Sequence, residues 1–182
     1  MEEYSVRTAR VEDAAEIARI NVASWRSAYR GIVPDEALAA LDVGELTALR
    51  RQRLADRARG VGGPLACGFV VVDGAGRVLG YVFGGEAHSL ANGDAPEPFE
   101  SEVYAIYLTP GYVRRGLGAR LLAAAARHLR TNGARSTIIW ALAQNPNRGF
   151  YEAQGGVVAY EQMITIGGKE LLEVGFGWPD LD

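Results

Sequence analysis

Hydrophobic and polar residues in the first half of the chain recur with periods that change from strand to helix and back. An alternating segment begins at Tyr4, and the next segment carries apolar residues at helical spacing. Pro34 opens a second helical region, whose apolar stripe consists of Leu38, Leu41, Leu46, Leu49 and Leu54. The predicted elements are a strand over residues 4–10, a helix over 12–29, a helical region that ends by Gly60, and strands over 68–73 and 78–86. The sequence Asp-Gly-Ala-Gly between the last two strands is typical of a hairpin turn.

The second half alternates between strand and helix patterns. A strand over residues 102–108 leads through a glycine-rich turn to a helix over 117–132 and then to a strand over 137–143. Because a strand, a helix and a strand within about 30 residues form a βαβ unit, at least two central strands should be parallel. The remaining predicted elements are a short helix over residues 147–154 and strands near 157–166 and 170–178, joined by Gly167-Gly168.

Length and composition agree with one domain over residues 1–182. The chain is 48% hydrophobic and 23% charged, which is near the average for globular proteins. We predict an α/β (α+β) fold, with a single mixed, mostly antiparallel central sheet, a parallel βαβ unit and helices on both faces. Residues 87–100 are polar, contain two prolines, and are predicted to form a functional loop.

Other features of the composition exclude several kinds of protein and site. The uncharged apolar runs are much shorter than the roughly 18–20 residues of a membrane span. Acidic residues, Glu2 and Glu3, stand where a signal peptide has its basic region, and no apolar region follows, so we expect a cytoplasmic protein. Cys67 is the only cysteine, which excludes internal disulfides and cysteine-rich zinc sites. His88 and His128 lie far apart, so no metal centre is expected.

Charge is distributed unevenly along the chain. Residues 103–151 contain no Asp or Glu but seven arginines, a local balance of +7. The rest of the chain holds 12 basic and 22 acidic residues, a balance of −10. Because nearby carboxylates oppose the binding of an anion, the arginine-rich part should face an anionic ligand. A chance cluster of solvated arginines is the alternative.

The segment Val-Arg-Arg-Gly-Leu-Gly-Ala-Arg-Leu-Leu, residues 113–122, lies between a predicted strand and a predicted helix. A helix N-terminus leaves backbone N–H groups unpaired and carries partial positive charge, so it binds anions. Gly116 and Gly118 have no Cβ atom and allow close approach of the backbone to a phosphate. Arg114, Arg115 and Arg120 add positive charge, so a phosphate or pyrophosphate should bind here.

Two common nucleotide motifs do not fit this turn. A P-loop needs a lysine, and the chain has lysine only at Lys169. A dinucleotide fingerprint needs a third glycine, where this chain has Leu121, and an acidic residue about 20 positions further on. No Asp or Glu occurs between Glu102 and Glu152. Coenzyme A needs neither a metal-binding carboxylate nor a carboxylate that holds a ribose, so it fits the turn.

Three blocks of sequence resemble the GCN5-related N-acetyltransferase (GNAT) superfamily. The turn resembles its acetyl-CoA signature [QR]-x-x-G-x-[GA], although Val113 stands where Gln or Arg is usual. Residues 145–156, Asn-Pro-Asn-Arg-Gly-Phe-Tyr-Glu-Ala-Gln-Gly-Gly, resemble the later N-x-x-x-x-[FL]-Y-E-x-x-G segment. Residues 25–35, Trp-Arg-Ser-Ala-Tyr-Arg-Gly-Ile-Val-Pro-Asp, resemble the end of the first helix in small bacterial members.

The resemblance implies transfer of an acetyl group from acetyl-CoA to a primary amine of a small molecule or peptide, by direct attack in a ternary complex. It places the pantetheine along the strand over residues 102–108 and the pyrophosphate on the glycine-rich turn. The implied cofactor-binding residues are Ile106, Leu108, Val113, Arg114, Arg115, Gly116, Leu117, Gly118, Ala119, Asn145 and Arg148. A helix cap for Asn145 and a solvated surface position for Arg148 are the plain alternatives.

The resemblance also suggests an acid and a base. Tyr151 occupies the position of the family tyrosine that protonates the departing thiolate, although core packing is an alternative. Glu102 has the spacing from the turn at which several members carry a glutamate base, acting directly or through water. A solvated carboxylate is the alternative for Glu102, and Glu100 is the rival base.

Trp25 and Tyr29 lie four residues apart on one helix face, and the resemblance places this region over the acceptor site. Core packing is the alternative for both. Asp94, Glu97, Glu100 and Glu102 bring four carboxylates into nine residues. This favours a cationic acceptor with more than one amine, or with an amine beside a guanidinium, over a free amino acid. A mobile acidic loop that is kept solvated for solubility is the alternative. A catalytically silent acyl-CoA-binding domain is the alternative function. The sequence points to no nucleic-acid or membrane partner and leaves a homodimer open.

Overall fold

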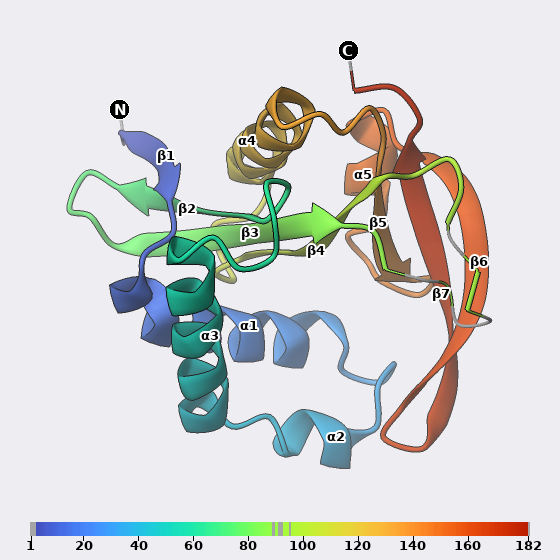
Figure 1. The fold of residues 1–182 in the computed structure, drawn as a ribbon. Coiled ribbons are helices and arrows are strands. Elements are labelled where there is room, and N and C mark those ends of the chain that lie inside the picture. The colour runs from blue at the N-terminus through green and yellow to red at the C-terminus, as the bar shows by residue number, and fades with distance from the viewer. Residues whose placement is uncertain (1–2, 89, 91–92, 95, 182) are drawn as a thin grey trace.

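Seven strands form one sheet in the computed structural model, which describes residues 3–88, 90, 93–94 and 96–181 (Figure 1). The strands follow the order β1-β2-β3-β4-β5-β7-β6 across the sheet. All neighbouring pairs are antiparallel except β4 and β5, which confirms the predicted mixed sheet and the parallel βαβ unit. The strands are β1 (Tyr4–Thr8), β2 (Cys67–Asp73), β3 (Val78–Glu86), β4 (Ser101–Leu108), β5 (Thr137–Leu142), β6 (Val157–Ile166) and β7 (Lys169–Trp178).

Helices cover both faces of this sheet, as predicted. In Figure 1 the first three helices lie below β3, and the last two lie above it and beside β5. The helices are α1 (Ala14–Ala28), α2 (Asp35–Ala39), α3 (Val43–Ala58), α4 (Leu117–Thr131) and α5 (Gly149–Ala153). We refer to the two sides as the α1–α3 face and the α4–α5 face.

The α4 helix forms because its apolar residues recur once per turn. Leu117, Leu121 and Leu129 are fully buried on one side, whereas Arg120 and Arg127 point outward. Burial of each leucine contributes about 1.5–3 kcal/mol. The turn that precedes α4 is therefore anchored by the helix that follows it.

One helix prediction was wrong at its start, and the predicted second helical region contains two helices. The segment predicted as one helix over residues 12–29 begins with a 3-10 turn, Val11–Asp13, before α1 starts. The region from Pro34 to Gly60 is two helices, because the Asp42 carboxylate accepts a hydrogen bond from the Glu45 amide at 2.8 Å and starts a new helix. The predicted leucine stripe is also interrupted within α3, where Leu49 is 42% exposed.

Of the predicted loop, residues 89, 91, 92 and 95 lie outside the described part of the chain. The Asp-Gly-Ala-Gly segment forms the predicted turn between β2 and β3, where Asp73 accepts from the amides of Ala75 and Arg77. The Gly167-Gly168 turn joins β6 and β7, also as predicted.

Strands β4 and β5 pair over a short length only. Their register joins Ser101 to Thr137, Glu102 to Ile138 and Val103 to Ile139, whereas β4 continues beside β3 as far as Leu108. A bulge at Tyr104 shifts the β3–β4 register just where the pairing with β5 ends. The two strands then diverge, and the resulting gap in the hydrogen-bond ladder is called the wedge below.

The turn between β6 and β7 reaches across to the segment between α1 and α2 (Figure 1). A Cβ atom on Gly167 would lie 2.8 Å from the Cβ of Ala37, so the two segments are in close contact. The Lys169 ammonium donates a hydrogen bond to the Ile32 carbonyl at 2.7 Å. The β6–β7 hairpin thereby fixes the end of α1 relative to the sheet.

Asp13 links β1 to the start of α1, and its loss should destabilise the fold. Two hydrogen bonds from Arg7, at 2.7 and 2.8 Å, reach this buried carboxylate. Burial by itself would raise the pKa of Asp13, but the hydrogen bonds from Arg7 and the Arg10 amide outweigh burial and lower it. The stabilisation is therefore present at neutral pH and is lost as the pH falls through the lowered pKa. We expect Asp13→Asn to lose about 1–3 kcal/mol at pH 7 in urea unfolding, with a smaller loss at pH 3.

Glu12→Gln serves as the control for this prediction, because Glu12 is exposed on the same turn. Equal unfolding free energies for Asp13→Asn and wild type at pH 7 would contradict a stabilising role of the Arg7 pair.

Candidate active site

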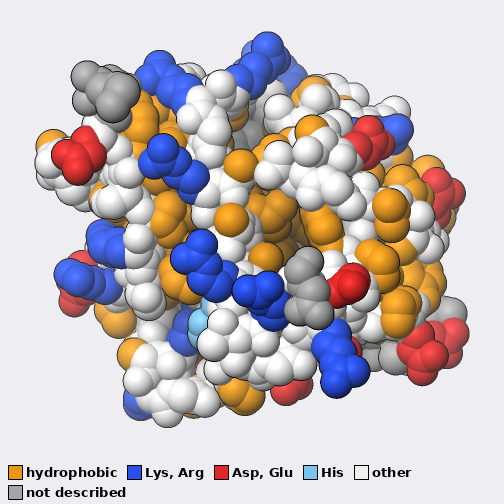
Figure 2. Space-filling model, turned by 90° about the horizontal axis from the view of Figure 1, so that it is seen from above, with side chains coloured by type: hydrophobic (Ala, Val, Ile, Leu, Met, Phe, Trp, Pro, Cys, Tyr) orange, Lys and Arg blue, Asp and Glu red, His pale blue; other side chains and the backbone are white. Residues whose placement is uncertain are grey.

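The turn before α4 presents backbone amides to solvent. Gly116 is the N-cap of α4 and has φ of 75°, a conformation that glycine adopts without strain. Arg114 also has a positive φ, 61°, and is the only non-glycine residue in the described chain to do so. Residues 113–116 are all exposed. Figure 2 looks down on the α4–α5 face and shows Lys and Arg side chains spread over it.

Arginine side chains fasten this turn to β1. The Arg115 guanidinium lies over the Tyr112 ring at 4.9 Å and donates to the Tyr4 hydroxyl at 3.3 Å. Arg120 donates to the Tyr4 carbonyl at 3.0 Å. These contacts hold two of the three arginines beside the turn, at the place where the sequence predicts an anion.

Gly118 is required for packing inside the protein as well as for an open turn. A Cβ atom at this position would lie 3.3 Å from the Phe150 ring on α5. At Gly116 a Cβ would meet nothing within 4 Å, so its constraint is the backbone conformation alone. The two glycines of the motif therefore serve different purposes.

The segment after β5 turns back toward α1. The Asn145 side chain is buried, its amide donates to the Tyr29 hydroxyl at 3.2 Å, and its carbonyl oxygen accepts from the Asn147 amide at 2.9 Å. Arg148 is exposed and donates to the Ala143 carbonyl at 3.0 Å. Asn145 thus joins the predicted cofactor side to the predicted acceptor side.

Tyrosine side chains from three elements meet at the wedge. Trp25 and Tyr29 pack edge to face with ring centroids 5.0 Å apart, which confirms that they are neighbours. The Trp25 indole N–H donates a hydrogen bond to the Tyr107 hydroxyl at 3.0 Å. Tyr151 is buried against Phe176, with centroids 5.3 Å apart. Burial, together with the proximity of Tyr107, raises the pKa of both Tyr29 and Tyr151. These hydroxyls remain protonated at neutral pH.

Glu102 lies at the closed end of the wedge. It is 8% exposed and accepts hydrogen bonds at 3.1 Å from the backbone amide and the ring Nδ1 of His88. The His88 side chain is itself largely exposed and stacks on Tyr104. Glu100, the rival base, is exposed and accepts from the Arg135 amide at 2.7 Å, on the turn between α4 and β5.

Glu173 on β7 is a functional candidate that sequence reasoning missed. It accepts a hydrogen bond from Gln162 at 3.1 Å, and burial raises the pKa of its carboxyl. The available signal was its spacing: residues 171 and 173 share one strand face, and Leu171 is buried. A carboxylate at an inward-facing position of a strand is unfavourable unless it has a hydrogen-bonding or charged partner, so such a position suggests a functional role.

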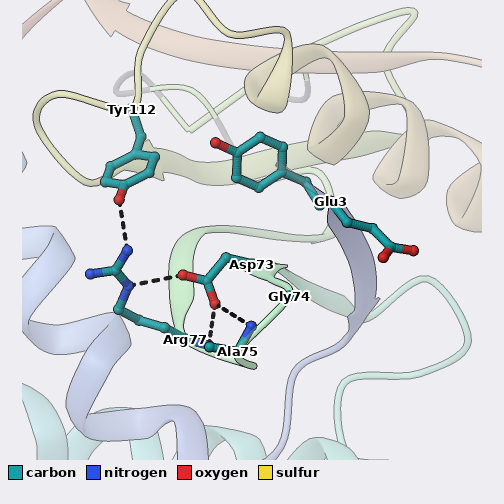
Figure 3. A pocket seen from close by; sticks show the side chains of 7 residues that line it. Glu3, Asp73, Gly74, Ala75, Arg77 and Tyr112 are labelled. Atoms are coloured by element: carbon teal, nitrogen blue, oxygen red, sulfur yellow. Dashed lines mark hydrogen bonds and ion pairs between the residues drawn. The ribbon is translucent and has the colours of Figure 1, made fainter. Parts of the chain in front are cut away.

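A pocket of about 270 Å³ lies elsewhere, between β1 and the β2–β3 turn. Figure 3 shows Arg77 among the lining residues, where it donates hydrogen bonds to the Asp73 carboxylate at 3.1 Å and to the Tyr112 hydroxyl at 2.7 Å. None of the predicted catalytic residues lines it, so the wedge is the better candidate.

Within the part of the chain that the structure describes, no cluster of three His, Cys, Asp or Glu residues could hold a metal. No helix among these residues has the length and apolar character needed to span a bilayer.

The chain matches known acetyltransferases over most of its length. The model of the "Acetyltransferase (GNAT) family" matches residues 25–156, which include the glycine turn, the wedge strands and α5. The chain belongs to the GNAT family. A curated relative, the uncharacterized N-acetyltransferase YuaI of Bacillus subtilis (strain 168), is 36% identical over 177 residues, which cover 97% of this chain and 94% of that protein.

Solved structures of other proteins have a similar fold. The PaiA N-acetyltransferase of Thermoplasma acidophilum, in complex with coenzyme A, has a TM-score of 0.66 at 17% identity and covers 94% of this chain and 98% of its own. YncA of Salmonella typhimurium, with acetyl-CoA, has a TM-score of 0.69 at 20% identity and covers 99% of this chain and 95% of its own. These solved structures share the fold of this chain.

The hydrogen bond between Asn145 and Tyr29 should contribute to stability. Tyr29→Phe leaves the buried Asn145 amide without its acceptor, which costs about 1–3 kcal/mol. Urea unfolding followed by tryptophan fluorescence measures the change. Tyr112→Phe removes a hydroxyl that bonds an exposed arginine and should change the unfolding free energy much less. Equal effects of the two variants would contradict a special role for the Asn145 contact.

Proposed function

We propose that this GNAT protein is an acetyl-CoA-dependent N-acetyltransferase that acetylates a primary amine of a small molecule or peptide by direct attack in a ternary complex. The observation that carries the proposal is the alignment of the wedge with the glycine turn. Strand β4 runs past the wedge and leads within eight residues to the N-terminus of α4. A long ligand can therefore place its phosphate end at the N-terminus of α4 and its reactive end at the wedge. The coenzyme A complexes of the PaiA and YncA structures support the same choice of ligand.

The backbone of β4 is oriented to bind the pantetheine. The Thr109 amide donates to Leu79 on β3 at 2.8 Å, and backbone groups alternate in direction along a strand. The amides of Ile106 and Leu108 therefore point away from β3, toward the wedge. The Leu108 carbonyl accepts from the Ser24 hydroxyl at 2.8 Å, as this orientation requires. The other proposed contacts with the pyrophosphate are the amides of residues 113–119 and the side chains of Arg114, Arg115 and Arg148. Asn145 is proposed to contact the cofactor through its side-chain amide.

Acetyl-CoA supplies a thioester to the wedge, and the residues there supply the proton transfers. The attacking amine must lose a proton, which Glu102 accepts directly or through water. The nitrogen–carbon bond forms as the carbon–sulfur bond breaks. Tyr151 donates its phenolic proton to the departing thiolate and regains one from solvent. Its raised pKa keeps the phenol protonated at neutral pH.

The acceptor is proposed to be cationic. Glu102 lies at the wedge, but the Glu100 carboxylate is bonded to the Arg135 amide, so the charge at the acceptor end comes from fewer loop carboxylates than the sequence suggested. Trp25 and Tyr29 place aromatic rings on the same side, and aromatic faces attract cations. A cytoplasmic location and a homodimer remain predictions from the sequence.

Gly118→Val should weaken the binding of acetyl-CoA at least tenfold, about 1.4 kcal/mol. The larger side chain displaces Phe150 and distorts the turn that holds the pyrophosphate. Isothermal titration calorimetry measures the dissociation constant. Ala123→Val places the same side chain on the exposed side of α4 and should bind normally. Normal binding by Gly118→Val would put the cofactor site elsewhere.

Tyr151→Phe should lower kcat by about 10²–10⁴ with little change in acetyl-CoA affinity, because a general acid is lost and the ring is kept. Thiol release with a panel of amines measures the rate, and Tyr160→Phe on β6 is the matched control. A wild-type rate in Tyr151→Phe, with chemistry shown to limit turnover, would remove Tyr151 from the mechanism. Tight acetyl-CoA binding by wild-type protein without transfer to any amine would identify a silent acyl-CoA-binding domain.

A further inference from the structure

Glu173 lies at the open end of the wedge. It pairs with Leu142, the last residue of β5, and with Gln162 on β6. Pairing between β4 and β5 ends at Ile139, three residues before Leu142. At about 3.3 Å per residue, Glu173 lies roughly 10 Å beyond the last β4–β5 pair, where Glu102 and Val103 are found.

The side chain of Glu173 belongs to the α1–α3 face. Paired residues on neighbouring strands point to the same side, and so do residues two apart on one strand. Leu142 and Leu171 are both packed in the cluster of Tyr29 and Leu38, beneath α1 and α2. Tyr151 packs with Val174 and Phe176 in the cluster of the opposite face. The proposed acid and the Glu173 carboxylate therefore approach the wedge from different sides.

Nothing in the described chain neutralises this carboxylate. Gln162 donates to it at 3.1 Å, but among the described residues no Arg, Lys or His forms an ion pair with it. The other titratable groups that it influences are Glu102, Tyr29 and Tyr107. Burial raises the pKa of Glu173, and the negative charge of Glu102 raises it further, whereas the Gln162 hydrogen bond lowers it. A cation that arrives between the two carboxylates relieves both unfavourable effects.

We propose that Glu173, held in place by Gln162, binds a second cationic group of the acceptor, so that the preferred substrates are amines that carry another positive charge near the attacked nitrogen. This inference rests on the proposed function. The attacked nitrogen lies beside Glu102 and the thioester, and the second cation lies further out along the wedge, beside Glu173. Tyr29 borders the space between them.

A matched pair of amines tests the proposal. 1,4-Diaminobutane and 1-aminobutane have the same carbon chain, and only the first carries the second cation. We expect wild-type kcat/KM to be at least tenfold higher for the diamine, and Glu173→Gln to remove most of this preference by raising KM for the diamine. The kcat of Glu173→Gln at saturation and its acetyl-CoA affinity should change little. Glu170→Gln, an exposed glutamate on the same strand, is the control and should behave as wild type.

Different failures have different signatures. Equal kcat/KM values for the two amines in wild type, or activity in a wider panel only with neutral or anionic amines, would overturn the role of Glu173 but leave the acetyltransferase function intact. A Glu173→Gln variant that loses kcat equally on every amine would also overturn it, because a general base or a structural residue behaves in that way. No turnover of any amine by a protein that binds acetyl-CoA would refute the proposed function itself.

Stability gives a readout that is independent of turnover. A carboxyl whose pKa is raised by folding destabilises the protein when it ionises, and this cost appears as the pH rises through the raised pKa. Glu173→Gln should therefore melt at a higher temperature than wild type at pH 8, and the difference should close below the ordinary carboxyl pKa of 4.5. 1,4-Diaminobutane should raise the melting temperature of wild type with bound coenzyme A, which carries no acetyl group to transfer, but not that of Glu173→Gln. A less stable Glu173→Gln at pH 8 would assign the residue a structural role instead.

Discussion

The early end of the hydrogen bonding between β4 and β5 is the constraint on which the site depends. Backbone groups in the interior of a sheet need partners, and beyond Val103 the amides of β4 that face away from β3 have lost the strand that would supply them. The bulge at Tyr104 turns β4 aside at this point. The wedge thus exposes β4 backbone groups that no neighbouring strand pairs with. An extended ligand that contains amide groups can form hydrogen bonds with them.

The elements around the wedge are arranged so that each side has a separate task. The α4–α5 face contributes the glycine turn, its arginines and Tyr151, which suits an anionic ligand that leaves as a thiolate. The α1–α3 face contributes aromatic rings and carboxylates, which suits an amine. The Asn145–Tyr29 hydrogen bond crosses between the two sides and keeps them in register. The two sides therefore meet at this buried contact.

Much of this arrangement could be predicted because its signals are local. The glycine turn, the βαβ unit and the two hairpins each occupy a short stretch of sequence with characteristic residues. The break between α2 and α3 is also local, but it depends on the cap at Asp42, which the leucine spacing obscured. Glu173 could not be placed, because its position at the wedge follows from the pairing of β7 with both β5 and β6, and such registers are set by packing across the whole sheet. The contact between Gly118 and Phe150 is hidden for the same reason: the two residues are far apart in sequence and meet only when α5 folds against α4.

The contact between the β6–β7 turn and the α1–α2 segment makes the acceptor side a separable module. Gly167 rests against Ala37, and Lys169 donates a hydrogen bond to the Ile32 carbonyl, so these two segments support each other. If the proposed acceptor site is correct, changes in length or sequence there would alter the entrance for the amine more than the turn before α4. A fold built in this way can diversify its acceptors through two surface segments, with the chemistry of acetyl transfer held constant.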